Sequence, residues 1–253
     1  LGSSIRSLEG LEDLESLENL TITGTPTNAS PVSLAPISGL LSLRNLAVIS
    51  RGVPSIGALR NLRLLRVLNL SNNQITDLEA LSGMIFLREL NLTNNLVTNL
   101  LPLQGLTNLE VLLISNNGIE NLFPLNRMRR LRIFRFSRNH ISNLLPLQLL
   151  TALEQLDFTT NDVASLQPLI GLSRLDRLFA DLASLVVFKH EDWPGLRKLS
   201  QFRAAEARGT RRRISVLVGN GGLYLPLELA RGADGAMTGF AFPEMLVQVC
   251  EKH

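Results

Sequence analysis

Two consecutive stretches of the chain decide its fold: LRELNLTNNLVTNLLPLQGLTN at residues 87–108 and LEVLLISNNGIENLFPLNRMRR at residues 109–130. Each stretch is 22 residues long, and the apolar residues, the asparagine and the proline recur at matching positions. The leucine at the first position shows that the interval also holds outside this pair: Leu43, Leu65, Leu87, Leu109, Leu131, Leu153 and Leu175. A fixed period of this length indicates that the chain is built from stacked copies of one short unit.

The pattern within one copy predicts a strand, a turn and a return segment. Leu90 and Leu92 alternate with polar residues, which is the period of a strand with one buried face. An asparagine amide can donate and accept hydrogen bonds, so we expect a structural role for the residues that follow at the turn: Asn73, Asn95, Asn117, Asn139 and Asn161. Prolines recur on the return segment, where no ladder hydrogen bond is needed: Pro36, Pro102, Pro124, Pro146 and Pro168.

These residues resemble the leucine-rich repeat family, and the 22-residue length with a return-path proline is most similar to its internalin-type or phosphatase-regulator-type members. The resemblance covers residues 1–178. It implies a curved solenoid with parallel strands on the concave side and short helical or extended segments outside. It also implies recognition of a protein partner. One unit cannot bury its own leucines, so we expect stability to come from neighbouring units.

The register predicts two irregularities near the start of the chain. The first residues match the second half of a unit, so we expect earlier repeats upstream: Ile5, Leu8, Leu11 and Leu14. From Leu17 to Leu43 is 26 residues, four more than the period, which predicts a loop over Thr25 to Ser33.

Composition bounds the remaining possibilities for this 253-residue chain. The content of 45% hydrophobic residues is ample for a core, yet no run of about 18 apolar residues predicts a membrane span. A net charge of +3 is modest and does not by itself indicate a class of binding partner. The single cysteine, Cys250, excludes an internal disulfide framework and leaves the compartment open, with the cytoplasm favoured.

The register also selects candidate partner-binding residues on the concave face: Glu89, Asn91, Leu113, Arg132, Arg135, Arg138 and Asp157. A lateral column of arginines would suit an acidic protein partner: Arg44, Arg66, Arg88 and Arg132. We favour the alternative of a mixed, solvated surface, because acidic residues interrupt the same region: Glu110, Glu154 and Asp157. We expect no nucleic acid partner, since Phe134 and Phe136 are core positions and cannot stack on bases.

The chain changes character after Leu178, and residues 179–253 predict parallel β/α units. Strand-like runs cover Leu185 to Phe188, Ile214 to Val218 and, more weakly, Ala236 to Phe240. Helical patterns lie between and after them: Leu196 to Ala207, Leu223 to Ala230, and a third from Pro243 to Cys250.

Residues 172–253 carry a second resemblance, to the C-terminal part of the dihydrodipicolinate synthase and N-acetylneuraminate lyase family. Its residues are Val186 to Lys189, Gly195 to Leu199, Val216 to Gly219 and Arg231 to Met237. The resemblance implies three strands of a (β/α)8 barrel, numbered six to eight. It also implies that Lys189 forms a Schiff base with pyruvate or another 2-oxo acid, and that Gly219 and Met237 line the substrate.

The second resemblance is incomplete, so we expect no catalysis from this chain alone. The family's proton-relay tyrosine and carboxylate-binding loop have no counterpart, because the only tyrosine, Tyr224, follows the seventh strand. Three strands cannot enclose a substrate, so an active lyase would need another chain to complete the barrel. A genuine fusion and a join of two truncated genes both remain open. We predict no cofactor, and no metal at His190, Glu191 and Asp192, which are adjacent and cannot converge.

Overall fold

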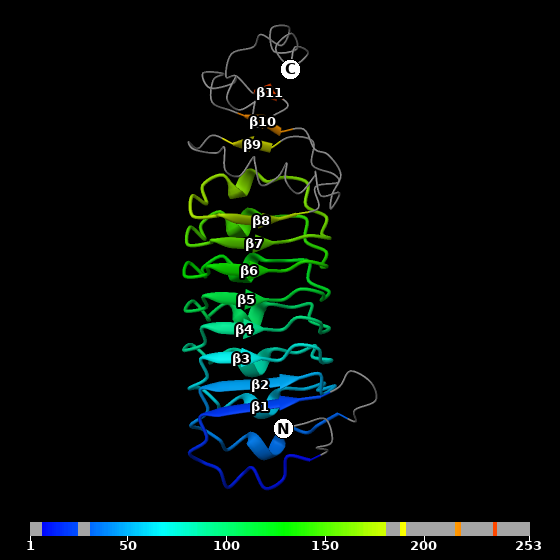
Figure 1. Cartoon of the computed structure of the whole chain (residues 1–253), viewed down its shortest axis with the longest axis vertical. Helices are drawn as coiled ribbons and strands as arrows, with labels where there is room; N and C mark the ends of the chain where they lie inside the picture. The colour runs from blue at the N-terminus through cyan, green and yellow to red at the C-terminus, as the bar shows by residue number, and fades with distance from the viewer. Residues whose placement is uncertain (1–6, 25–30, 181–187, 191–215, 219–234, 237–253) are drawn as a thin grey trace.

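The computed structural model describes residues 7–24, 31–180, 188–190, 216–218 and 235–236. In the first two ranges, eight parallel strands form one sheet, and each strand pairs with the next along the chain. Figure 1 shows them stacked in sequence order: β1 (Asn19–Thr23), β2 (Asn45–Ile49), β3 (Val67–Asn69), β4 (Glu89–Asn91), β5 (Val111–Leu113), β6 (Ile133–Arg135), β7 (Gln155–Asp157) and β8 (Arg177–Phe179). One strand per repeat confirms the predicted solenoid architecture.

The register of this sheet follows the sequence repeat. From β2 to β8 the paired residues are one repeat apart, as Leu90 with Leu112 and Phe134 with Leu156. Between β1 and β2 the interval is longer, since Leu20 pairs with Leu46. The four extra residues therefore lie between these two strands, as predicted. Residues 25–30 of the expected loop lie outside the described residues.

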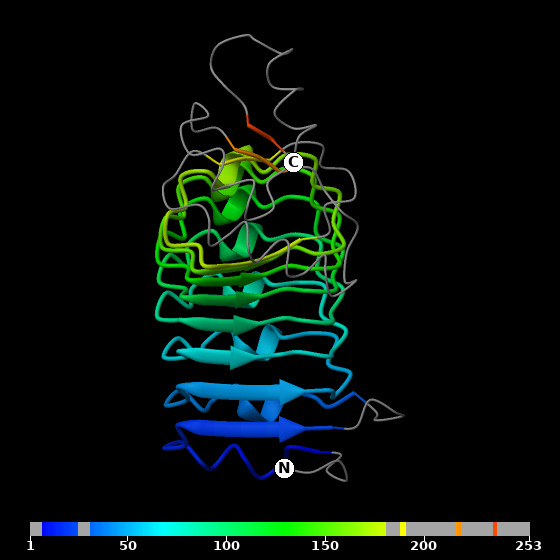
Figure 2. The same cartoon turned by 45° about the horizontal axis from the view of Figure 1, so that its top comes forward.

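Short 3₁₀ helices form the side of the solenoid away from the strands, which we call the helix side (Figure 2). In the described residues they are η1 (Ala35–Ile37), η2 (Gly57–Leu59), η3 (Glu79–Leu81), η4 (Leu101–Leu103), η5 (Phe123–Leu125), η6 (Leu145–Leu147) and η7 (Gln167–Leu169). Five of them carry the repeated proline in the first turn, where its missing N–H is not needed. A Ser, Asp or Asn oxygen two residues earlier accepts the first N–H of each helix. The prediction of short helical return segments is confirmed.

The repeated leucines form one continuous core along the solenoid. Each leucine at the first repeat position from Leu43 to Leu175 is at most 4% exposed. Burying one such side chain contributes about 1.5 to 3 kcal/mol, but only when the neighbouring coil covers it. Phe134 and Phe136 are also buried, with ring centroids 4.6 Å apart. The prediction that these two aromatic residues belong to the core is confirmed.

The turn asparagines join each coil to the one before it. The Nδ2 group of Asn95 donates to the carbonyl oxygens of Leu70 and Leu92, each at 3.0 Å. Its Oδ1 atom accepts the N–H of Ile75 at 3.0 Å. The same bonds recur at Asn73, Asn117, Asn139 and Asn161. The predicted structural role of these amides is confirmed, because each satisfies buried backbone groups of two repeats.

Arg51 breaks this column beside the inserted loop. The register places an asparagine at this position, yet the chain has an arginine that is only 2% exposed. Its backbone N–H donates to Oδ1 of Asn73 at 3.1 Å. A Cβ atom at Gly24 would lie 2.7 Å from Cδ of Arg51 and 2.1 Å from the carbonyl oxygen of Ser50. Gly24 therefore makes room for a turn that the repeat pattern did not predict.

Three short strands are described in the rest of the chain: β9 (Phe188–His190), β10 (Val216–Val218) and β11 (Gly235–Ala236). They form a parallel sheet in the order β11-β10-β9, and Lys189 pairs with Leu217. Of the predicted runs, Ile214 to Val218 contains β10, whereas β9 and β11 share only Phe188 and Ala236 with the other two. The predicted helices lie outside the described residues, and the barrel fragment stays a prediction.

Candidate protein-recognition surface

The strands divide their side chains between core and solvent. In β3 to β7 the middle residue of each strand is buried, whereas the first and third lie on the solvent side. We define the strand face as the solvent-side residues of β4 to β7: Glu89, Asn91, Val111, Leu113, Ile133, Arg135, Gln155 and Asp157. Five of the seven predicted partner-binding residues belong to it: Glu89, Asn91, Leu113, Arg135 and Asp157.

The centre of the strand face is apolar. Val111 pairs in register with Ile133, and Leu113 pairs with Arg135 on the adjoining strand. The three apolar side chains are half-buried and therefore still reach solvent. Val111 and Ile133 were absent from the predicted set, although the alternation around the buried Leu112 and Phe134 places them on this face. Charged residues border the three: Glu89 on β4, Arg135 on β6 and Asp157 on β7.

Two polar residues of the strand face are held by the turn that follows them. The Oδ1 atom of Asn91 accepts the N–H of Thr93 at 2.9 Å. The Oδ1 atom of Asp157 accepts the N–H of Thr159 at 3.1 Å and its hydroxyl at 3.0 Å. Because these bonds fix the side chains, little conformational entropy remains to be lost when a ligand binds.

Arg132 lies outside the strand face, in the column of residues that immediately precede the strands. We call this column the edge column: Glu18, Arg44, Arg66, Arg88, Glu110, Arg132, Glu154 and Asp176. Its side chains form three ion pairs in which a guanidinium of one repeat meets a carboxylate of a neighbouring repeat: Arg44 with Glu18, Arg88 with Glu110, and Arg132 with Glu154. The register confirms that the four predicted arginines share one column, but four carboxylates share it with them: Glu18, Glu110, Glu154 and Asp176. This favours the mixed-charge alternative for the edge column.

The pair between Arg132 and Glu154 has a forked geometry. Nε of Arg132 donates to Oε1 of Glu154 at 3.0 Å, and Nη2 donates to Oε2 at 2.9 Å. These hydrogen bonds hold the pKa of the Glu154 carboxyl below its ordinary value and raise the pKa of Arg132. The Arg132 guanidinium is therefore largely occupied by its ion pair with Glu154, although both side chains are partly exposed.

Arg138 lies in the turn after β6 and has a left-handed backbone, with φ at 55°. Asparagines occupy the same position in three preceding repeats, with φ at 59°, 57° and 56°: Asn72, Asn94 and Asn116. Their amides form a ladder, in which Nδ2 of Asn116 donates to Oδ1 of Asn94 at 2.9 Å. The three arginines predicted to act together, Arg132, Arg135 and Arg138, thus stand in three different columns.

The residues of the second resemblance are only partly described. Lys189 is the middle residue of β9, and only its backbone pairing is described. Gly219 and Met237 lie outside the described residues. Their roles around a 2-oxo acid stay predictions.

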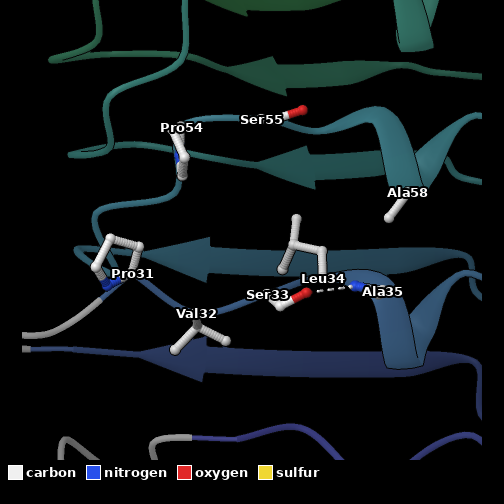
Figure 3. A pocket seen from close by; sticks show the side chains of 8 residues that line it. All are labelled: Pro31, Val32, Ser33, Leu34, Ala35, Pro54, Ser55 and Ala58. Atoms are coloured by element: carbon white, nitrogen blue, oxygen red, sulfur yellow. Dashed lines mark hydrogen bonds between the residues drawn. The ribbon is translucent and has the colours of Figure 1, made fainter.

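A hollow of about 380 Å³ lies between the return segments of two early repeats (Figure 3). It is lined by Pro31, Val32, Ser33, Leu34, Ala35, Pro54, Ser55 and Ala58. The two hydroxyl oxygens accept N–H groups of their own turns, Ser33 from Ala35 at 3.3 Å and Ser55 from Gly57 at 3.4 Å. The lining therefore offers mainly apolar contacts and no cluster of ionisable side chains.

The described part of the chain shows neither a membrane-spanning helix nor a cluster of metal ligands. No helix there is long and apolar enough to cross a membrane. Within the same residues, no three His, Cys, Asp or Glu side chains gather as metal ligands.

Comparison with known proteins agrees with this architecture. A family model of two leucine-rich repeats matches residues 63–105. No curated protein sequence matches the chain. Among solved structures, internalin C2 of Listeria monocytogenes is 30% identical with a TM-score of 0.66, over 70% of this chain and 76% of that one. A second internalin of that organism, inlF, is 25% identical with a TM-score of 0.65, over 94% of this chain and 78% of that one.

A plant peptide hormone receptor, solved in a complex, is similar in fold alone. It is 16% identical with a TM-score of 0.60, over 82% of this chain and 33% of the receptor. The internalin C2 match is stronger and covers most of both proteins. Given that match and one strand for every 22-residue unit, the chain belongs to the leucine-rich repeat family.

Proposed function

We propose that the strand face binds a protein ligand. The observation that carries the proposal is the apolar centre of Val111, Leu113 and Ile133, which reaches solvent and is bordered by charged residues. Protein interfaces have this composition, with an apolar centre that excludes water and a polar rim that sets orientation. The parallel sheet holds the centre rigidly, so binding costs little ordering of the backbone.

The relatives support a binding function of this kind. Two internalins match this chain over most of both proteins, and a plant peptide hormone receptor of similar fold was solved in a complex. Solenoids present an extended surface to their ligands, and the strand face is the extended surface of this chain.

The charges of the strand face define the ligand's chemistry. Glu89 and Asp157 are acidic, and Arg135 is basic and exposed. A ligand that complements this rim carries both signs of charge around an apolar side chain. A uniformly acidic ligand fits less well, because the two edge-column arginines that precede strands of this face already form ion pairs, Arg88 with Glu110 and Arg132 with Glu154.

The proposal can be tested by selecting ligands from a phage-displayed library of random peptides on the immobilised chain. The selected peptides are then measured against a strand-face variant, Leu113→Glu with Ile133→Glu. We expect these changes to weaken binding by about 30-fold or more, since truncation or disruption of a central contact typically costs about 2 kcal/mol or more. A matched control, Gln104→Glu with Gln148→Glu, changes the same number of charges on the helix side and should bind normally.

A circular dichroism spectrum of each variant shows whether the fold is kept. Peptides that bind the strand-face variant as tightly as the original chain would contradict the proposal. A second variant separates the arginines: Arg135→Glu should weaken binding by about tenfold, as reversal of a rim charge does, and Arg132→Glu should weaken it less.

We propose a second candidate function for the remainder of the chain, Schiff-base chemistry at Lys189. What supports it is the resemblance of residues 172–253 and the parallel order of β9, β10 and β11. The neutral amine of Lys189 would condense with the carbonyl of pyruvate and release water, in an assembly where another chain supplies the missing strands. Borohydride would reduce that imine to a stable secondary amine. Absence of a mass increase on Lys189 after treatment with pyruvate and borohydride would exclude Schiff-base chemistry at this residue.

A further inference from the structure

Three neighbouring repeats expose a large apolar side chain at one position of the helix side. Leu101, Phe123 and Leu145 begin η4, η5 and η6, and they are 53%, 65% and 53% exposed. The other described repeats have small or polar residues at this position: Ala35, Gly57, Glu79 and Gln167. We call the three residues the helix-side stripe.

The stripe is unusual because nothing in the repeat architecture requires it. Glu79 and Gln167 begin 3₁₀ helices of the same kind, so an apolar residue at this position is not needed for the fold. The three side chains together present on the order of 300 Å² of apolar surface, which is the size of the largest apolar patch on a typical monomer, and such patches are often functional.

We propose that the helix-side stripe is the contact surface between two copies of this chain. The two copies are related by a two-fold axis that runs parallel to the stack of repeats. This axis places each residue of the stripe on its own counterpart, with Phe123 packed against Phe123 of the second copy. The two surfaces match along their length because both copies have the same spacing between repeats.

Charges beside the stripe select this arrangement. Glu120 and Arg127 are exposed and lie before and after η5 on the same coil, so they flank Phe123 on opposite sides. The two-fold axis exchanges the flanks, so Glu120 of each copy faces Arg127 of the other. A two-fold axis perpendicular to the stack would instead place Glu120 opposite Glu120, which repels. Complementary charge therefore favours a second copy in the parallel orientation.

The size of the stripe fits a weak dimer. A standard interface buries about 800 Å² of each partner, and the stripe supplies roughly a third of that as its apolar centre. Exposed and half-exposed amides around it supply an uncharged rim: Gln104, Asn126 and Gln148. The strand faces lie on the other side of each copy and stay open, so a dimer presents two ligand-binding surfaces. The inference thus goes beyond the proposed function and does not depend on it.

Sedimentation equilibrium of the full chain tests the proposal. We expect reversible dimers with a dissociation constant in the micromolar range, as suits an interface at the small end of the usual sizes. Phe123→Glu should leave a monomer at every concentration, because it buries a charge at the centre of the contact. The fold should survive, since Glu79 occupies the same position in η3. Leu96→Glu is the matched control, because Leu96 is 58% exposed and lies outside the stripe.

Charge reversal tests the orientation of the two copies. Glu120→Arg alone, or Arg127→Glu alone, should weaken the dimer by about tenfold, whereas both changes together should restore it. A chain that stays monomeric at high concentration would overturn the proposal, and so would dimers that Phe123→Glu leaves intact. A double variant no better than either single variant would overturn the parallel arrangement.

Discussion

The turn asparagines and the strand face belong to the same repeats, yet their sequences behave in opposite ways. Asn73, Asn95, Asn117, Asn139 and Asn161 are identical, and each bonds the backbone of two coils. Along the third residue of the strands, by contrast, the side chain changes from Asn91 to Leu113, Arg135 and Asp157. Identity from coil to coil marks residues that hold the solenoid together, and variation marks residues that the fold leaves available for binding.

The largest expected contrast lies between two adjacent leucines of β5. Leu112 is fully buried, whereas Leu113 is half-buried on the strand face. Leu112→Ala should lower the free energy of unfolding by about 3 to 5 kcal/mol, because it leaves a cavity in the core. Leu113→Ala should cost less than about 1 kcal/mol. Urea denaturation of both variants measures the difference, and equal losses would show that the strand does not divide core from solvent.

A second contrast compares two asparagines of one repeat. Asn95→Ala removes the partners of the Leu70 and Leu92 carbonyls and of the Ile75 N–H, so it should cost about 2 to 4 kcal/mol. Asn91→Ala, on the strand face, should cost about 1 kcal/mol or less, since it removes one bond that water can replace. Thermal unfolding followed by circular dichroism separates the two. Similar melting temperatures for the two variants would show that the turn asparagines do not stabilise the fold.

A smaller effect of opposite sign is expected at the turn after β6. Arg138 has φ at 55°, a conformation that asparagine adopts more readily than arginine. Arg138→Asn should therefore stabilise the chain by about 0.5 to 1 kcal/mol. The matched change Arg135→Asn, in an extended strand, should bring no gain. Chemical denaturation of both variants measures the change in the free energy of unfolding. A loss of stability in Arg138→Asn would mean that contacts of the arginine side chain stabilise the fold by more than its left-handed backbone costs.

The smallest expected effect concerns the pair between Arg132 and Glu154. Hydrogen bonding from Arg132 lowers the pKa of Glu154 in the folded state, so its contribution to stability is present above the unfolded pKa. It is lost as the pH falls through the folded pKa. An NMR titration of the Glu154 carboxyl should show a midpoint below the ordinary value, and Arg132→Gln should return the midpoint toward it. An unchanged midpoint in the variant would exclude Arg132 as the cause.

The same division between repeated and varied residues explains what the sequence could predict. A period that recurs in every unit reveals the sheet, the leucine core and the turn amides, because Leu43 and Asn95 have the same environment as their counterparts. It does not reveal Arg51, which departs from the pattern beside the inserted residues between β1 and β2. Nor does it reveal which carboxylate Arg88 contacts, since Glu110 pairs with it through side-chain conformations that the repeat does not determine.

The candidate surface was predicted less completely than the fold. Arg132 and Arg138 were predicted to bind because they are charged. In the structure Arg132 forms an ion pair with Glu154, and Arg138 lies in the turn after β6. Val111 and Ile133 carry no charge and resemble core residues by composition, so only their place in the alternation assigns them to the strand face. Apolar residues at solvent-side positions were the stronger signal of a binding surface.

The most direct test of this account is a glutamate scan of β4 to β7 that records unfolding and binding of the selected peptides in the same samples. We expect glutamate at the middle position of a strand to abolish cooperative unfolding: Leu90, Leu112, Phe134 and Leu156. Glutamate at Val111, Leu113 or Ile133 should leave the melting temperature within a few degrees and remove binding, because a surface change alters stability little. Solvent-side variants that unfold, or that stay folded and bind the peptides normally, would contradict this account.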